Sequence, residues 1–256
     1  SKVLLLIFLL TVILLPILIN SGQVALNPIE VAQQVTVVIA LLFFMYFVGL
    51  FIFGALSLSE RKAFGAILLI CIASILFWAG FEQAGSSLNL FTRDFTNRLV
   101  ANFEIPTAWF QSINSIFIII LSPFFASLWI NLGKRLTQPY FGLKCAAGLL
   151  TMALGFIVMF FAAQVAASGL KVAPSWLITT YFLHTVGELC ISPVALSAIS
   201  KLSPKRFTGQ MMGLFTLTYS IGSLLAGLIA GKFNPENVQE MPLLFLQIGT
   251  YSIIAG

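Results

Sequence analysis

The chain has 256 residues, of which 59% are hydrophobic and only 8% are charged, and its mean hydropathy is +1.04. A water-soluble domain needs about a quarter of charged residues to cover its surface, so this composition excludes the soluble classes of protein. We attribute the net charge of +5 to membrane topology rather than to nucleic-acid binding, because most basic residues stand in short polar stretches between apolar runs.

Eight apolar segments alternate with short polar stretches along the chain. Their lengths are typical of α-helices that cross a bilayer, which need about 20 residues, and not of the shorter alternating strands of membrane barrels. The polar stretches contain the Gly, Pro, Asn and charged residues that end helices. We therefore predict an all-α integral membrane protein. The segments cover approximately residues 3–19, 31–57, 63–92, 106–131, 140–168, 174–200, 207–232 and 242–256.

The two ends of the sequence indicate a piece of a longer protein. Ser1 and Lys2 lead directly into an apolar segment, and the last segment, from Pro242, is shorter than the ~20 residues that a span needs. When Lys2 is placed inside and the sides alternate at every span, nine of the 13 Lys and Arg residues fall inside. The positive-inside rule then places the amino end of this chain in the cytoplasm.

The first two apolar segments differ from the other six. Residues 3–19 and 31–57 have no ionisable residue at depth, so we predict that they form a peripheral, lipid-facing pair. The next six form two successive triplets, and the first segment of each carries a carboxylate, Glu82 or Glu188. Such a match is typical of the three-plus-three repeats of major facilitator transporters.

A line of polar residues marks the end of segment 63–92. Trp78, Glu82, Ser86, Asn89 and Arg93 follow one another at spacings of four, four, three and four. On a single helix this spacing places them along one face. A carboxylate within a span needs a partner, a water-filled cavity or a proton, so Glu82 is a candidate functional residue. The alternative is a polar packing group that a neighbouring helix satisfies.

Glu188 is the strongest single candidate, because it lies at the midpoint of its segment. Pro193 follows five residues later, removes one backbone hydrogen bond and frees a carbonyl near Leu189. Such a kink is tolerated where neighbours or cavity water satisfy the backbone, which favours a substrate site beside Glu188. The alternative is a structural pair of Glu188 with His184. For His184, the only histidine, we favour a packing role over a proton relay.

Other polar groups carry weaker signals. An amide within a span usually bonds to a neighbouring helix, so Asn114 alone indicates packing. Cys71, Cys145 and Cys190 lie in apolar runs without any metal-binding spacing and are predicted to be small core residues. No hydrolase, phosphate-loop, zinc or redox motif is present. We therefore predict no catalytic residue, metal or cofactor, and a protein that is not an enzyme.

Four motifs, in this order, resemble the carboxy-terminal half of the proton-dependent oligopeptide transporter family. They are FWAGFEQAGSSLNLF from Phe77, QSIN at Gln111–Asn114, GELCISPVALSAISKLSP at Gly187–Pro204 and GQMMGLFTLTYSIGSLLAG at Gly209–Gly227. The resemblance implies a major facilitator fold in which residues 61–256 form helices seven to twelve, the twelfth incomplete. It also implies that residues 1–60 form two extra helices inserted between the two six-helix halves.

The resemblance further implies proton-coupled symport of di- and tripeptides by alternating access across the bacterial inner membrane. The partners would be the peptide, protons, the lipid bilayer and the missing amino-terminal half. Glu188 would pair with the amino terminus of the peptide, assisted by Asn114. Glu82 would couple protons to transport by pairing with an Arg of the amino-terminal half.

The resemblance also implies an aromatic pocket for the side chain of the peptide. Trp78 and Phe81 would line this pocket, with Ser192 nearby on the kinked helix, and Gln83 would face the cavity. Phe215 stands where many members of the family have Trp, so the pocket wall is expected to differ in shape. The implied substrate-binding set is Trp78, Phe81, Glu82, Gln83, Asn114, Glu188, Ser192 and Phe215.

A dipeptide is zwitterionic, so it needs an anionic anchor at one end and a cationic anchor at the other. Glu188 would supply the first, and the second would come from the missing half. Glu82 could switch between a protonated and an ion-paired state, and a difference in affinity between two conformations would drive the change. Two alternatives remain open: a family member that moves another substrate, such as nitrate or a modified amino acid, and a non-transporting membrane scaffold.

Overall fold

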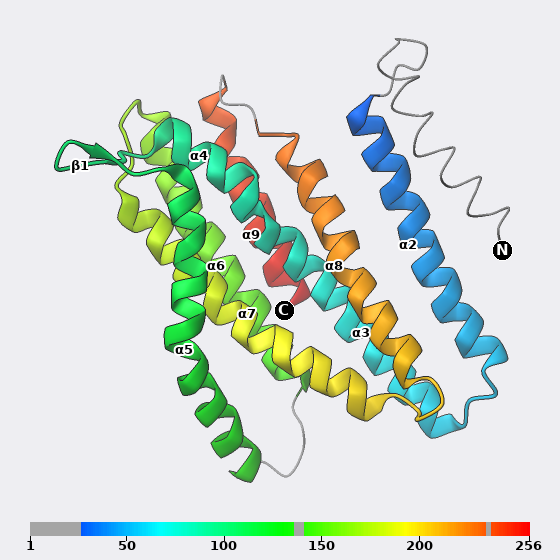
Figure 1. The fold of residues 1–256 in the computed structure, drawn as a ribbon. Coiled ribbons are helices and arrows are strands. Elements are labelled where there is room, and N and C mark those ends of the chain that lie inside the picture. Colours follow the sequence, from blue (N-terminus) through cyan, green and yellow to red (C-terminus); the bar gives the residue numbers. More distant parts are fainter. Residues whose placement is uncertain (1–26, 136–140, 234–236) are drawn as a thin grey trace, which may run out of the picture.

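The long apolar segments of the sequence form long helices. The computed structural model describes residues 27–135, 141–233 and 237–256 (Figure 1). Its helices are α2 (Pro28–Phe53), α3 (Leu58–Phe81), α4 (Ser87–Phe95), α5 (Thr107–Arg135), α6 (Phe141–Ala167), α7 (Pro174–Leu202), α8 (Thr208–Ala230) and α9 (Met241–Ala255). Shorter elements are the 3₁₀ turns η1 (Glu82–Gly85) and η2 (Val238–Glu240) and the hairpin of β1 (Leu99–Val100) and β2 (Phe103–Glu104).

Within the described ranges, six helical stretches are long and apolar enough to cross a membrane. They correspond to the predicted segments from 31–57 to 207–232, which confirms the all-α membrane fold. The last predicted segment corresponds to α9, which has 15 residues. The first, residues 3–19, lies outside the described residues.

α3 begins at Leu58, before the predicted start at residue 63. Ser57 and Glu60 form a capping box: Ser57 Oγ accepts from the Glu60 backbone N–H at 3.3 Å, and Glu60 Oε2 accepts from the Ser57 N–H at 2.8 Å. These two bonds satisfy backbone donors that an α-helix leaves free at its start. The polar first turn therefore belongs to the helix, although it lies outside the apolar segment.

The predicted segment 63–92 is not one helix. α3 ends at Phe81, η1 adds one tighter turn, and Ser86 leaves helical geometry with φ −125° and ψ −100° before α4 begins. The five polar residues therefore do not follow one face, and this prediction is wrong. Gly85 weakens the helix, and Ser86 Oγ bonds the Glu82 carbonyl at 3.3 Å, as serines do where they compete with the helix backbone.

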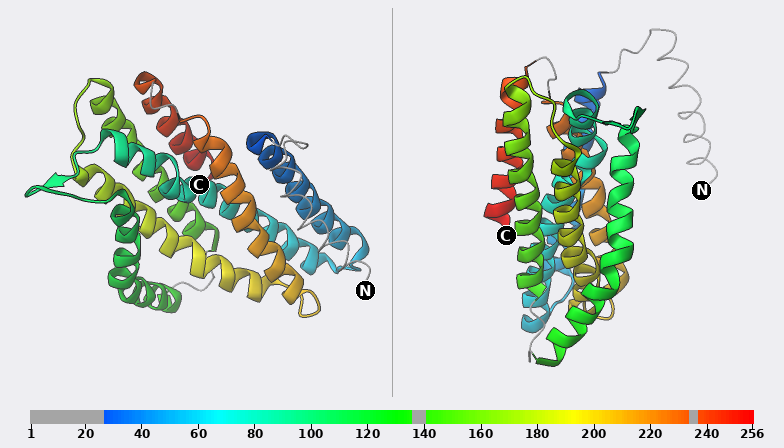
Figure 2. Two further views of the ribbon diagram at one scale, coloured as in Figure 1. Left: turned by 45° about the horizontal axis from the view of Figure 1, so that its top comes forward. Right: turned by 90° about the vertical axis from the view of Figure 1, so that its left-hand side faces the viewer.

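The long helices pack side by side (Figures 1 and 2). α6 packs against both α7 and α9, α3 packs against α8, α5 packs against α7, and α2 lies on α8 at the edge of the bundle. Gly148 of α6 and Gly187 of α7 allow a close approach, because a Cβ at either position would lie within 2.9 Å of the carbonyl oxygen of the other.

At one end of the bundle, two loops are joined by backbone hydrogen bonds. The Val172 N–H donates to the Phe95 carbonyl and the Asn97 N–H donates to the Val172 carbonyl, both at 2.8 Å. Lys171 Nζ donates to the Asp94 carbonyl at 2.5 Å. This end, which also carries the β1–β2 hairpin, is called the hairpin end below. It connects α4 directly to the start of α7.

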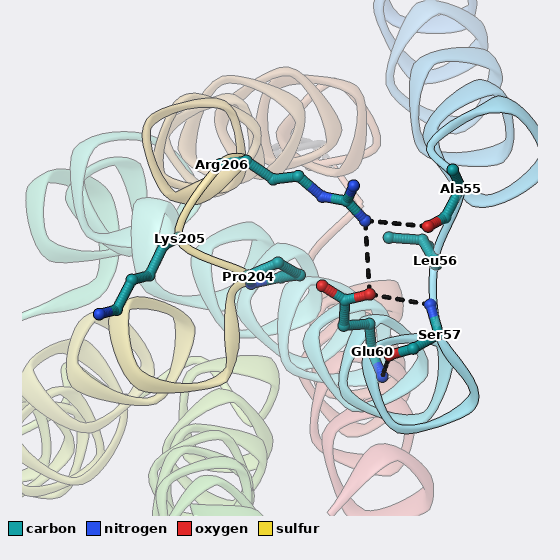
Figure 3. Close-up of a pocket in the computed structure, with 7 residues that line it drawn as sticks. All are labelled: Ala55, Leu56, Ser57, Glu60, Pro204, Lys205 and Arg206. Atoms are coloured by element: carbon teal, nitrogen blue, oxygen red, sulfur yellow. Dashed lines mark hydrogen bonds and ion pairs between the residues drawn. The ribbon is translucent and has the colours of Figure 1, made fainter.

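At the opposite end, the loop between α7 and α8 reaches the loop between α2 and α3 (Figure 3). Arg206 Nη2 donates to the Ala55 carbonyl at 3.0 Å and lies 3.4 Å from Glu60 Oε2. A hollow of about 640 Å³ lies here, and Figure 3 shows that Lys205 points away from the Arg206 ion pair. This end is called the Arg206 end below.

Candidate functional site

An amide from α5 binds the Glu188 carboxylate on α7. Asn114 Nδ2 donates to Glu188 Oε2 at 3.2 Å and to Thr185 Oγ1 at 2.9 Å. Thr185 Oγ1 in turn donates to the Tyr181 carbonyl at 2.7 Å, so it acts as an acceptor toward Asn114. Asn114, which the resemblance implied would assist Glu188, is therefore in contact with this carboxylate, and both side chains are half-buried.

His184 does not belong to this pair. It is buried, its ring lies 4.8 Å from the Phe156 ring of α6, and a Cβ at Gly155 would overlap the imidazole. Among the described residues, no hydrogen bond or ion pair joins His184 to Glu188. The alternative of a structural pair is therefore not found, and the position of His184 fits a packing role.

Glu82 belongs to the same region as Glu188. It is the first residue of η1 and is exposed. α3, which ends directly before Glu82, packs against α7, the helix that carries Glu188. The two predicted carboxylates therefore come from neighbouring parts of the same bundle.

The predicted aromatic residues cluster, but they are mostly covered. The Trp78 ring centroid lies 5.2 Å from that of Phe81 and 4.3 Å from that of Tyr219, and the planes of Trp78 and Tyr219 make an angle of 34°. Trp78 is 7% exposed and Phe215 is 2% exposed. Phe215 packs edge-on against Tyr219, with ring centroids 5.6 Å apart. Tyr219, which is partly exposed like Phe81, packs against both Trp78 of α3 and Phe215 of α8.

Gln83 does not face a cavity, so this expectation is wrong. Its side chain is fully buried, and Nε2 donates to the Ala79 and Ala226 carbonyls, both at 3.1 Å. Its Oε1 accepts from Ser87 Oγ at 2.7 Å. These bonds join the end of α3, the start of α4 and the middle of α8. The position fits a structural link across the helix break.

The carbonyl that Pro193 frees has a partner. Trp129 Nε1 of α5 donates to the Leu189 carbonyl at 3.3 Å. Lys144 Nζ of α6 lies 4.4 Å from the centre of the Trp129 ring, within the range of a cation–π interaction. α7 continues through Pro193 as one helix. The sequence left two possible partners for this carbonyl, a neighbouring group or cavity water, and in the structure Trp129 is the partner.

Sequence reasoning missed three residues of this region: Thr185, Trp129 and Tyr219. Tyr219 packs against the rings of Trp78 and Phe215, whereas Ser192 Oγ, another predicted site residue, is buried without a hydrogen-bond partner among the described residues. The sequence did contain a signal for Tyr219, because this residue follows Phe215 by one helical turn in the motif GQMMGLFTLTYSIGSLLAG. For Trp129 no local signal exists, because its partner lies on another helix.

The titratable groups show no arrangement typical of a metal site. In the part of the chain that the structure describes, no group of three or more His, Cys, Asp or Glu side chains lies close enough to hold a metal ion. Cys71, Cys145 and Cys190 are buried free thiols. The polar chemistry of the region therefore rests on carboxylates, an amide, hydroxyls and indole N–H groups.

Known proteins match this chain over nearly its whole length. It is 39% identical over 247 residues to the peptide transporter YePEPT of Yersinia enterocolitica, covering 96% of this chain and 48% of the relative. It is 30% identical over 241 residues to dipeptide and tripeptide permease A of Escherichia coli, covering 94% and 47%. The chain thus spans about half the length of these curated relatives.

The fold also matches solved structures. A crystal structure of a peptide transporter POT in complex with sulfate has a TM-score of 0.86 and 33% identity, over 99% of this chain and 50% of that chain. This match confirms the expected transporter fold. The sequence pattern of the POT family matches residues 31–244. The chain belongs to the POT family, and it forms a multi-pass membrane bundle.

Proposed function

We propose that the complete protein is a proton-coupled symporter that moves di- and tripeptides into the cell by alternating access. This chain would supply the carboxy-terminal half of the central cavity, and it would act as a transporter rather than an enzyme. The observation that carries the proposal is the half-buried Glu188 carboxylate, which accepts a hydrogen bond from Asn114. A carboxylate within a span marks a substrate or proton pathway by default.

Glu188 is the proposed anchor for the amino terminus of the peptide. Within the described residues, Asn114 binds only Oε2, so Oε1 is available for an ammonium group. The Asn114 amide is itself held by Thr185, which fixes the direction of the carboxylate. An oriented carboxylate in a partly dehydrated place binds a charged donor more strongly than one in water.

Glu82 is the proposed site of proton coupling. A carboxylate at the end of a membrane span needs a proton, a cation or water as a partner, and Glu82 is such a carboxylate. An exposed position on η1 suits a residue that would pair with an Arg of the amino-terminal half in one conformation. A proton would break that pair and shift the balance between conformations.

We further propose that the Arg206 end faces the cytoplasm of a bacterial cell and that the hairpin end faces outward. The Arg206 end carries Arg61, Lys62, Lys201, Lys205 and Arg206, as the positive-inside rule requires of a cytoplasmic side. Residues 1–60 would form the peripheral pair of helices between the two halves. The position of α2 at the edge of the bundle, on α8, supports this arrangement.

The test uses the full-length protein in liposomes, with uptake of labelled dialanine measured with and without an inward proton gradient. We expect gradient-driven accumulation that excess unlabelled dipeptide blocks and that Glu188→Gln abolishes. Glu240→Gln is the matched control, because it is the same substitution at an exposed residue of the 3₁₀ turn η2. Absence of accumulation in correctly oriented, folded protein would contradict peptide transport and favour another substrate. Wild-type rates in Glu188→Gln would contradict the role of Glu188.

A further inference from the structure

Tyr219 occupies the place where an aromatic pocket was expected. Its ring lies 4.3 Å from the Trp78 ring at 34° and 5.6 Å from the Phe215 ring at 80°. Trp78 and Phe215 are almost completely buried, although no amino-terminal half covers them in this chain. Tyr219 therefore presents its own ring and hydroxyl where these two aromatic faces would otherwise be open.

The ring is held from two sides, so it is not free to swing away at low cost. Gly222, one turn further along α8, lies directly against Trp78, where a Cβ would approach the Trp78 Cβ to 2.5 Å. This contact brings α8 close to α3 and presses the Tyr219 and Trp78 rings together. On another side, the Tyr219 ring meets the Phe215 ring edge-on. Tyr219 is thus packed between Trp78 of α3 and Phe215 of α8.

We propose that Tyr219 limits the size of the substrate side chain and makes the site favour peptides with small side chains. This inference rests on the proposed peptide transport and adds the substrate class to it. Tyr219 already covers a face of Trp78, so a large aromatic side chain of a peptide cannot stack on that face. A methyl side chain, as in dialanine, does not depend on such stacking.

Removal of the ring should reverse this preference. In Tyr219→Ala, the faces of Trp78 and Phe215 become available to a bulky apolar side chain. Each added group that fills an apolar pocket changes discrimination by roughly tenfold or more, so we expect alanyl-phenylalanine to gain about tenfold relative to dialanine. Tyr219→Phe keeps the ring, so its size preference should stay that of the wild type.

The experiment measures inhibition of labelled dialanine uptake by unlabelled dialanine and by alanyl-phenylalanine, in full-length protein in liposomes. The readout is the ratio of the two half-inhibitory concentrations for the wild type and each variant. Tyr251→Ala is the matched control, because Tyr251 is 62% exposed on α9 and makes the same chemical change away from the site. Tyr219→Leu provides a second variant in case Tyr219→Ala does not fold, with an expected shift of about threefold in the same direction.

The expected result is a shift in Tyr219→Ala, a wild-type ratio in Tyr219→Phe and a wild-type ratio in Tyr251→Ala. An unchanged ratio in a Tyr219→Ala protein that still transports dialanine would overturn the inference alone. A wild type that prefers alanyl-phenylalanine to dialanine would overturn it as well. If the wild type transports no dipeptide at all, the proposed function itself fails, which is a different outcome of the same assay.

Discussion

The two candidate carboxylates, Glu188 and Glu82, lie on helical runs of opposite behaviour: one contains a proline and stays continuous, and the other contains no proline and breaks. α7 contains Pro193 and yet continues as one helix, because Trp129 of α5 supplies a donor to the freed Leu189 carbonyl. The run from α3 to α4 contains no proline and yet breaks between Phe81 and Ser87. There, the side chains of Ser86 and Gln83 donate to the backbone carbonyls of Glu82 and Ala79 within the run itself. The comparison shows that the source of replacement hydrogen bonds, not proline alone, decides whether a span continues.

The largest expected effect separates the two carboxylates. Glu188→Gln should lower gradient-driven dialanine uptake by roughly a hundredfold, because it removes the charge that faces the ammonium group. Glu82→Gln should abolish gradient-driven accumulation but leave exchange of dialanine across the membrane without a gradient. Uptake and counterflow assays on both variants measure this difference. If Glu188→Gln also kept exchange at the wild-type rate, the two carboxylates would not have different roles.

The next effect concerns the link across the break. Gln83→Leu should lower the free energy of unfolding by about 2 to 3 kcal/mol, because the Ala226 carbonyl and the Ser87 hydroxyl lose a buried partner. Thermal unfolding of detergent-solubilised protein measures the change. Gln247→Leu on α9 is the control, since Gln247 is exposed. Equal stability of the two variants would show that the buried amide does not hold the break.

A smaller effect tests the donor that keeps α7 continuous. Trp129→Phe removes the indole N–H and keeps an aromatic ring under Lys144, so we expect a loss of about 1 kcal/mol in the free energy of unfolding. Trp109→Phe serves as the control, because Trp109 is exposed beside Phe103. A variant as stable as the wild type would indicate that water replaces Trp129 at the Leu189 carbonyl.

The smallest effect probes the hydroxyl that binds the Gln83 side chain at the break. Ser87→Ala should cost about 0.5 to 1 kcal/mol, because Gln83 keeps its two backbone acceptors and loses only one donor. Ser220→Ala, at an exposed position of α8, should be neutral within ±0.5 kcal/mol. Both values come from the same thermal unfolding series. A larger cost for Ser87→Ala than for Gln83→Leu would reverse the assigned order of importance.

Hydrophobic segments and local motifs predicted the helices, and the family resemblance implied the contact of Asn114 with Glu188. The freed carbonyl near Leu189 followed from Pro193, since a missing N–H is a local property. The break at Ser86 could not be predicted from the sequence. Gly85 and the two serines after it interrupt a helix only where other groups are present to take over its hydrogen bonds. Gln83 was misplaced because a buried and a cavity-facing amide look the same in sequence. Tyr219 was overlooked because burial of Trp78 and Phe215 depends on how closely α8 approaches α3.

The hydrogen bonds and ion pairs that join the loops at the two ends of the bundle differ in strength. This difference determines which end separates first under a mechanical force. The hairpin end is closed by two backbone hydrogen bonds and by Lys171 on the Asp94 carbonyl. The Arg206 end relies on a carbonyl bond and a partly exposed ion pair, a type of pair that contributes about 1 kcal/mol or less. A bending force applied at the middle of α7 would therefore open the Arg206 end first. The helices would then rotate about a point near the hairpin end.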